Sequence, residues 1–273
     1  MIEKMKQEIN IPFILDCLKN IGNEFLKDFK KSPVPTDEAG FYMLFQNNEE
    51  RCLTYLKEQL AAEFETIPFA DGEFEKSGQE NPLVIPEYWV CDAMDGAVQY
   101  IQHLPGWTIN IVLVKDGEPY FAAIFDPLMN EMFWAEKGRG AYLNGQKLSV
   151  SPKRNTRFIM AAFDHSSSPE KTPGLNQRTG LLVKELLEQY AIVRNFGPHG
   201  LQLASIGAGR IDVFCEEGLD TYNWLPGILI AREAGARIST TDGREWSWGE
   251  DSLFVAAPDR INDFIDKRLS KPV

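Results

Sequence analysis

The chain has 273 residues, of which 44% are hydrophobic and 25% are charged. This composition is ordinary for a globular protein, and the length allows a large core or two closely joined halves. The formal net charge is -12, from 40 acidic and 28 basic residues. Because nucleic-acid binding needs a basic surface, this balance argues against a nucleic-acid polymer as a partner.

The cysteines and the N-terminal residues indicate the cellular setting. The four cysteines show no spacing typical of a zinc site and are interpreted as reduced thiols; they are Cys17, Cys52, Cys91 and Cys215. The first ten residues carry no apolar segment of a secretory signal, and no uncharged apolar run is long enough to span a bilayer. We therefore expect a soluble, cytoplasmic protein with no membrane partner.

The first half of the chain predicts helices followed by antiparallel strands. Apolar residues at three-and-four spacing predict helices over about 11–29 and 49–63, with a break at 32–37 between them. The polar stretch 71–82 is interpreted as a loop or a hairpin. Short apolar runs joined by tight turns then predict strands at 88–91, 108–114, 120–125, 131–135 and 141–143.

The second half alternates strands with helices. Strands are expected at 158–163, 191–196, 210–215 and 252–257, and helices at 179–189, 201–208, 224–234 and 259–269. The change of pattern predicts a two-part α/β or α+β architecture. We place the boundary so that residues 1–152 form an N-terminal α+β half and residues 153–273 form a C-terminal α/β half that completes the site.

Two carboxylates occur at the end of one predicted strand, in the segment WVCDAMDG. Asp92 ends the strand, and the chain then turns so that Asp95 can point to the same place. Gly96 allows a close approach of the backbone, and two carboxylates suit a hard cation such as Mg²⁺. The amides after the turn could hold a phosphate. A solvated turn is the alternative interpretation, and the spacing alone favours it.

Four segments in order carry a resemblance to a known family. WVCDAMDG resembles the signature of the inositol monophosphatase family, in which a Trp and two apolar residues precede D-P-x-D-G-T. Residues 127–145, 194–216 and 222–236 are similar to later segments of that family. Together the matches cover most of residues 69–257. The resemblance implies a layered α-β-α-β-α sandwich of the inositol monophosphatase and fructose-1,6-bisphosphatase type.

The resemblance also implies an activity and a metal site. The expected function is Mg²⁺-dependent hydrolysis of a small phosphomonoester, such as an inositol, sugar or nucleotide phosphate. By the resemblance, Asp92 bridges two metals, Asp95 binds the second, and the carbonyl of Met94 is a further ligand. Glu73 is the best match to the carboxylate that binds metal and orients water, although Glu75 lies in the same loop. The expected catalytic residues are therefore Glu73, Asp92 and Asp95.

Further residues are expected to contact the substrate. The resemblance assigns the amides of Gly96 and Ala97 to the phosphate, and Glu216 to substrate hydroxyls. His199 lies beside the candidate pocket and could contact a phosphate or a hydroxyl, or be a loop histidine without a role. By analogy with the family, a homodimer is expected.

Two departures from the family pattern leave a second function open. Ala97 stands where the family has a threonine that helps to orient the attacking water, and Asn223 stands at the third metal-binding aspartate. The amide oxygen of Asn223 can still bind Mg²⁺, but more weakly. Asp220 could compensate, or it could cap a helix. The alternative function is a catalytically weak or silent relative that binds a phosphorylated ligand or a partner protein.

Overall fold

The computed structural model describes residues 9–70, 76–154, 156–165 and 172–269. Its elements form five layers in which helices and sheets alternate. This arrangement confirms the layered sandwich that the sequence predicts.

The first layer consists of two long helices, α1 (Ile11–Asp28) and α2 (Glu38–Glu63). Helix α1 has the bounds expected from its apolar spacing, but α2 begins well before residue 49. The reason is a cap: the side chain of Asp37 accepts a hydrogen bond from the backbone N–H of Gly40 at 2.7 Å. Such a cap satisfies a backbone donor that the first turn of a helix leaves unpaired. Asp37 was predicted to belong to the break between the helices.

The second layer is a six-stranded antiparallel sheet in chain order, as the meander pattern predicts. In its strand β2, Ile109 and Ile111 pack on the side of α1 and α2, whereas Val112 and Val114 pack on the opposite face. Because helices cover both faces, the strand carries an almost continuous apolar run. The strands are β1 (Glu87–Asp95), β2 (Thr108–Lys115), β3 (Glu118–Asp126), β4 (Glu131–Glu136), β5 (Gly140–Leu143) and β6 (Gln146–Lys147).

Short helices lie in the connections: α3 (Lys76–Glu80), α4 (Ala97–Ile101) and the 3-10 helix η1 (Thr156–Phe158). Helix α3 corrects the expectation of a loop or hairpin throughout 71–82. Contacts from distant parts of the chain hold it, because Trp248 Nε1 donates to the carbonyl of Gly78 at 3.0 Å and Thr221 Oγ1 donates to that of Gln79 at 2.7 Å. Sequence spacing does not report such contacts.

The remaining layers come from the second half of the chain. Five strands form a mixed sheet of order β10-β11-β9-β7-β8, in which β7 runs parallel to both β8 and β9. Its strands are β7 (Met160–His165), β8 (Ile192–Arg194), β9 (Val213–Glu217), β10 (Arg237–Ser239) and β11 (Ser252–Ala256). The helices are α5 (Leu175–Gln189), α6 (His199–Gly207), α7 (Thr221–Glu233) and α8 (Pro258–Leu269).

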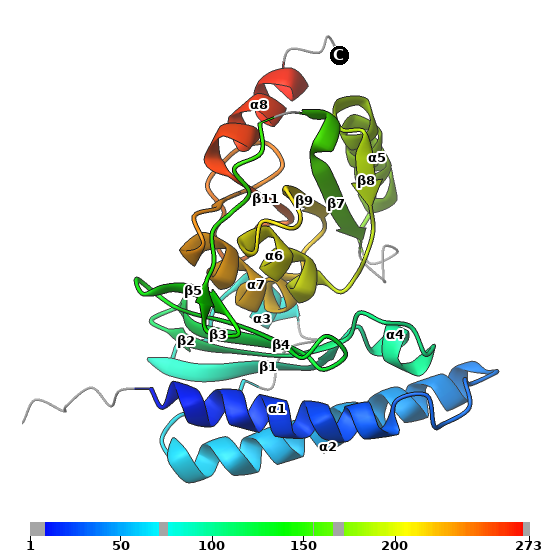
Figure 1. Cartoon of the computed structure of the whole chain (residues 1–273), viewed down its shortest axis with the longest axis vertical. Coiled ribbons are helices and arrows are strands. Elements are labelled where there is room, and N and C mark those ends of the chain that lie inside the picture. Colours follow the sequence, from blue (N-terminus) through cyan, green and yellow to red (C-terminus); the bar gives the residue numbers. More distant parts are fainter. Residues whose placement is uncertain (1–8, 71–75, 155, 166–171, 270–273) are drawn as a thin grey trace, which may run out of the picture.

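Helices α6 and α7 form the middle layer between the two sheets, while α5 and α8 lie on the outer side of the second sheet (Figure 1). The inner core therefore joins residues of both halves, with Tyr88 of β1 in the same cluster as Phe214 of β9. The two helices pack closely, since a Cβ atom at Gly227 would lie 2.4 Å from Leu203 Cβ. The division at residues 152 and 153 stays a prediction, and the halves on either side share this core.

Helices α6 and α7 begin earlier than their apolar patterns predict. His199 was placed before a helix at 201 and Asn223 before one at 224, but both lie in the first turn of their helices. Pro198 occupies the position before α6 and Asp220 the position before α7. Consequently the polar side chains of His199 and Asn223 lie at the first turns of two helices of the middle layer. The first turn of a helix has unpaired backbone N–H groups, so polar groups are common there.

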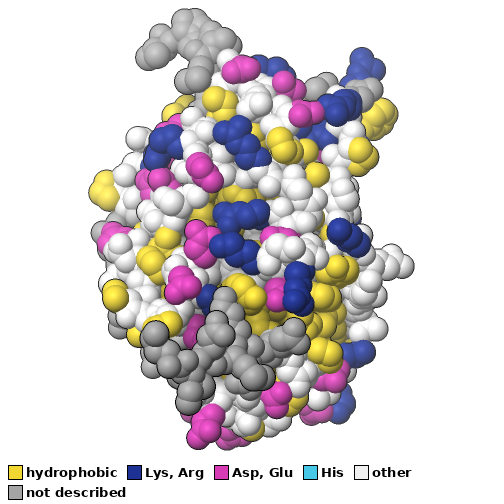
Figure 2. All heavy atoms as spheres, turned by 90° about the vertical axis from the view of Figure 1, so that its left-hand side faces the viewer, with side chains coloured by type: hydrophobic (Ala, Val, Ile, Leu, Met, Phe, Trp, Pro, Cys, Tyr) yellow, Lys and Arg dark blue, Asp and Glu magenta, His cyan; other side chains and the backbone are white. Residues whose placement is uncertain are grey.

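The surface carries mixed charge. On the face shown in Figure 2, basic and acidic side chains lie among one another, and the hydrophobic ones occur in small groups. Among the described residues, no helix has both the length and the apolar character needed to cross a membrane.

Candidate functional site

A cleft of about 730 Å³ opens where the end of β1 meets the starts of α6 and α7. Seven residues that the sequence predicted for the site line this cleft. One further carboxylate in the lining, that of Asp164, was not predicted. Within the described ranges, no lysine or arginine lines this cleft. The polar and backbone groups of interest come from Asp92, Met94, Asp95, Gly96, Ala97, Asp164, His199 and Asn223.

The two aspartates of the motif lie inside strand β1 and not after it. The register of β1 against β2 shifts between Asp92, which pairs with Asn110, and Asp95, which pairs with Thr108. Irregularities of this kind redirect side chains near active sites. The expectation that the strand ends at Asp92 was therefore wrong, because the strand continues through an irregular segment to Asp95. Within that segment, Asp92 Oδ1 accepts a hydrogen bond from the N–H of Met94 at 3.2 Å.

Gly96 makes the turn from β1 into α4. Its φ of 86° lies in the left-handed region, and an added Cβ atom would lie 2.5 Å from the carbonyl oxygen of Gly106. Only glycine meets both conditions without strain. The next residue, Ala97, is buried beside Asp95 and offers no hydroxyl. The close carbonyl of Gly106 and the positive φ together require glycine at the turn that follows the two aspartates.

Asp95 is buried and firmly held by one of its oxygens. Its Oδ2 accepts hydrogen bonds from Asn110 Nδ2 at 2.8 Å and from the N–H of Gly200 at 2.9 Å. Burial raises the pKa of Asp95 to about 6, against the opposing effect of His199 and these two bonds. The geometry leaves Oδ1 for a ligand. Asn110 was not predicted for the site, although a single polar residue inside the apolar run TINIVLV is a usable signal.

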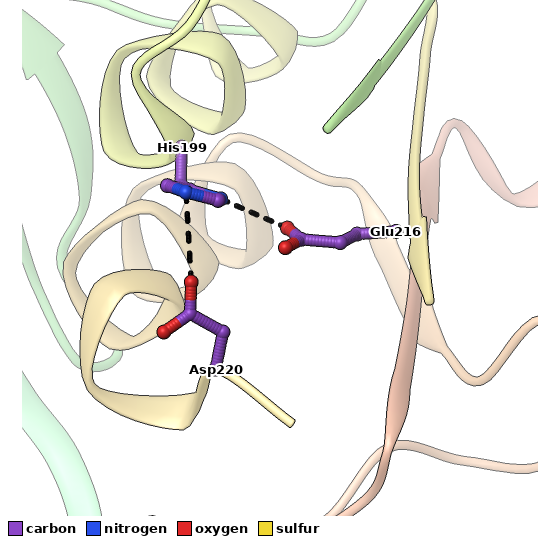
Figure 3. A group of neighbouring side chains, drawn as sticks. All are labelled: His199, Glu216 and Asp220. Carbon is purple, nitrogen blue, oxygen red and sulfur yellow. Dashed lines mark hydrogen bonds and ion pairs between the residues drawn. The ribbon is translucent and has the colours of Figure 1, made fainter. Parts of the chain in front are cut away.

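His199 lies between two carboxylates, as Figure 3 shows. Its Nδ1 is 2.9 Å from Glu216 Oε2, and its Nε2 is 3.5 Å from Asp220 Oδ2. Burial alone would disfavour the imidazolium, but Glu216 and Asp220 hold the pKa of His199 well above its usual range. Burial in turn raises the pKa of Glu216 to about 7, although His199 opposes this shift. The group is therefore a compact set of coupled charges.

Asp164 is a site carboxylate that the sequence analysis missed. It lies near the end of β7, where its Oδ2 accepts from Gln202 Nε2 at 2.8 Å and its Oδ1 from Asn195 Nδ2 at 3.3 Å. Its Oδ2 is also 3.9 Å from His199 Nδ1. The signal was available, because Asp164 follows an apolar strand in the same way as Asp92.

The other predicted residues have different outcomes. Glu73 and the neighbouring Glu75 lie outside the described residues. Glu216 is fully buried and is not among the described residues that line the cleft, whereas His199 does line it. Any direct contact between Glu216 and a substrate stays a prediction.

Asn223 lines the cleft and is bonded to Asp220. Its Nδ2 donates to Asp220 Oδ1 at 2.9 Å, while its Oδ1 is buried without a hydrogen-bond partner in the part of the chain that the structure describes. Asp220 occupies the position before α7, but its side chain makes no capping bond to the described start of that helix. Its carboxylate points instead toward His199. Asp220 is therefore at the N-cap position that the alternative interpretation gave it, but its side chain does not cap the helix.

These groups fit a hard cation. Carboxylate oxygens of Asp92 and Asp95 and the unpartnered amide oxygen of Asn223 line one cleft, and Mg²⁺ prefers such oxygen ligands. A phosphate dianion would meet mainly negative charge here, since no described lysine or arginine lines the cleft. An anionic substrate therefore needs a cation that is bound together with it.

Comparison with known proteins shows the family to which the chain belongs. The model of the inositol monophosphatase family matches residues 12–271. An inositol-1-monophosphatase of Caulobacter vibrioides is 31% identical over 186 residues, which are 66% of this chain and 70% of that protein. The chain is also similar to the Nus factor SuhB of Escherichia coli K12, at 33% identity over 171 residues. That match spans 62% of each chain, which is less than two thirds of SuhB.

A solved structure agrees with the fold. The extragenic suppressor protein suhB from Bartonella henselae superposes with a TM-score of 0.77 at 19% sequence identity. The match covers 96% of this chain and 99% of that one. At this identity the likeness concerns the fold and not the chemistry of the cleft.

Proposed function

The chain belongs to the inositol monophosphatase family, and we propose that it hydrolyses a small phosphomonoester with the help of Mg²⁺. The observation that carries the proposal is that Asp92, Asp95 and the Asn223 amide oxygen line one cleft, which no described lysine or arginine lines. Such a cleft attracts a divalent cation and, through it, a phosphate. The proposed substrates are inositol, sugar or nucleotide phosphates.

The proposed cation ligands come from the end of β1 and from residues around it. Asp92, Asp95 and the carbonyl of Met94 would hold the cation, with Glu73 and Asn223 as further proposed ligands. When bound, Mg²⁺ would lower the pKa of a water and neutralise phosphoryl oxygens. Asn110 and the N–H of Gly200 fix Asp95 Oδ2, so that the carboxylate has one orientation. A fixed carboxylate loses little freedom when a ligand binds.

The substrate side of the site is proposed to consist of Gly96, Ala97, His199 and Glu216. Gly96 and Ala97 line the cleft beside Asp95, where they would contact the phosphate. His199 reaches the cleft directly, and Glu216 fixes its ring from behind. Glu73 would orient the attacking water, because Ala97 has no hydroxyl. The cytoplasmic location and the homodimer also remain proposals.

Release of inorganic phosphate tests the function. The purified chain is incubated with a panel of inositol, sugar and nucleotide monophosphates, with Mg²⁺ and with a chelator. We expect turnover of at least one ester with Mg²⁺ and its loss with the chelator, because no described lysine or arginine lines the cleft to neutralise a phosphate in place of the cation. Absence of turnover over the whole panel would instead favour the second function below.

The second candidate is a catalytically weak or silent relative that binds a phosphorylated ligand or a partner protein. Ala97 and Asn223 favour it, because each removes a group on which the family's chemistry relies. One similar protein is called Nus factor SuhB, and this name does not refer to an enzyme activity. Against it stand Asp92 and Asp95, which lie together in the cleft.

Asn223→Asp should lower the Mg²⁺ concentration that gives half-maximal activity by several-fold. The added charge attracts a divalent ion by several kcal/mol even at an effective dielectric constant of about 20, and desolvation leaves on the order of 1 kcal/mol. The new carboxylate would also replace a donor that lies 2.9 Å from Asp220 Oδ1. Without Mg²⁺ the variant should therefore unfold at a lower temperature than the wild type.

A Mg²⁺ titration of activity and a thermal melt with and without Mg²⁺ measure both effects. An unchanged titration would show that residue 223 does not contact the cation.

A further inference from the structure

The cluster of His199, Glu216 and Asp220 has features of a second cation site. One potential ligand atom from each residue lies within 4.8 Å of the others. The three side chains come from different places, namely the first turn of α6, strand β9 and the position before α7. Figure 3 shows both carboxylates pointing toward the imidazole ring. The arrangement is therefore made by the fold and not by one local sequence motif.

The distances around the ring differ in a way that assigns two roles. Nδ1 and Glu216 Oε2 are 2.9 Å apart, which is a hydrogen bond with Nδ1–H as donor. Nε2 and Asp220 Oδ2 are 3.5 Å apart. Two ligands bound tetrahedrally to one zinc ion at about 2.0–2.1 Å lie roughly 3.3 Å from each other. The second separation thus fits two ligands of one ion better than it fits a good hydrogen bond.

The neighbours of the two ligands hold them in place. Glu216 Oε2 accepts from Trp224 Nε1 at 2.7 Å as well as from the ring, and Asn223 Nδ2 fixes Asp220 Oδ1 at 2.9 Å. Metal-binding histidines usually donate their other ring N–H to a carboxylate, which sets the tautomer and orients the ring. Glu216 stands in this relation to His199.

The local charge favours an added cation. Asp95, Asp164, Glu216 and Asp220 each interact electrostatically with His199, so that four described carboxylates share one imidazole. The side chain of Glu216 is 1% exposed, and its Oε1 has no hydrogen-bond partner among the described residues. A buried carboxylate in this condition costs free energy unless more positive charge approaches it.

We propose that His199 Nε2 and Asp220 bind a divalent ion of the zinc, cobalt or manganese class, with Glu216 holding the imidazole. The ion replaces the proton on Nε2, which is released to solvent. An imidazole ligand favours these metals over Mg²⁺, which prefers oxygen. Neither His199 nor Asp220 belongs to the proposed Mg²⁺ ligands around Asp92 and Asp95, although His199 is also proposed to face the substrate. The two proposals can therefore fail separately.

The test measures metal binding in the Asp92→Asn protein, in which the other proposed cation position has lost its bridging carboxylate. Zn²⁺ is titrated by equilibrium dialysis, and Co²⁺ binding is followed by proton NMR. We expect one Zn²⁺ per chain and, with Co²⁺, one paramagnetically shifted exchangeable proton from Nδ1–H of His199. Adding His199→Asn should weaken Zn²⁺ binding at least about tenfold and remove the shifted proton signal, since one ligand is lost.

Matched variants make the result specific. His103→Asn changes a histidine outside the cleft, one that interacts with the carbonyl of Ser32, and should leave binding unchanged. Asp220→Asn should weaken binding like His199→Asn, and it provides a second measurement if the histidine variant fails to fold. Loss of binding with His165→Asn in place of His199→Asn would overturn the proposal. Zn²⁺ binding that is as strong in the His199 and Asp220 variants as in the parent protein, or no binding in the parent protein, would also overturn it.

Discussion

Asp92→Asn should lower Mg²⁺-dependent phosphate release by at least about a hundredfold while leaving the fold intact. Asp92 is proposed to bridge two cations, so the substitution removes a negative charge from both at once. A metal acting as Lewis acid contributes several kcal/mol to the transition state, and each 1.36 kcal/mol is a tenfold change in rate. The half-buried side chain keeps its size and shape in asparagine, so little packing is lost.

Asp116→Asn is the matched control for this prediction. Asp116 lies exposed at the turn between β2 and β3, with a φ of 51° that asparagine tolerates. We expect its activity and its melting temperature to equal those of the wild type. Near-normal turnover in Asp92→Asn, with the control also normal, would show that the proposed cation position is in the wrong place.

Gly200→Ala should lower both stability and activity. An added Cβ atom would lie 2.7 Å from Asn110 Nδ2 and 2.9 Å from Asp95 Oδ2. The methyl group would therefore press on the two atoms that hold Asp95 and weaken the bond from Gly200 N–H to Asp95. Overpacking of this kind costs about 1–3 kcal/mol of the free energy of unfolding. Phosphate release should fall further than stability alone explains, because Asp95 loses its fixed orientation.

Gly180→Ala separates this effect from helix propensity. Gly180 is a residue of α5, and no atom of the described residues, apart from its chain neighbours and the backbone of its own helix, would lie within 4 Å of a Cβ atom added there. Alanine there should stabilise the protein by about 0.5–1 kcal/mol, since glycine costs that much inside a helix. Denaturant unfolding and phosphate release of both variants test the pair. A Gly200→Ala protein as stable and active as the wild type would show that Asp95 is not held as described.

The sequence predicted the layers because its periodicities reflect burial. Helix α1 buries one face, and its apolar spacing marks that face; strand β2 is covered on both sides and has a continuous apolar run. The starts of α2, α6 and α7 were missed because apolar spacing does not show polar first turns. Helix α2 is an example, because the cap at Asp37 starts it at Glu38, whereas the apolar pattern begins only near residue 49.

The site could be predicted in its centre but not at its edges. Asp92, Asp95 and Gly96 lie within one stretch of five residues, so one motif predicts all three. Asp164 lines the cleft from β7 and Asn110 holds Asp95 from β2, and only the fold brings these residues together. The orientation of Asp220 toward His199 depends on helix α7 starting at Thr221, which its apolar pattern did not indicate.

A crystal structure with Mn²⁺ and inorganic phosphate tests the central claim most directly, because Mn²⁺ replaces Mg²⁺ at oxygen ligands and has a strong anomalous signal. We predict anomalous density beside the carboxylates of Asp92 and Asp95 and the carbonyl of Met94. Phosphate should lie between this density and the backbone of Gly96 and Ala97. The contradicting result would be no anomalous density beside Asp92 and Asp95 at millimolar Mn²⁺, with phosphate bound elsewhere or not at all. It would show that this cleft is not a cation-dependent phosphatase site.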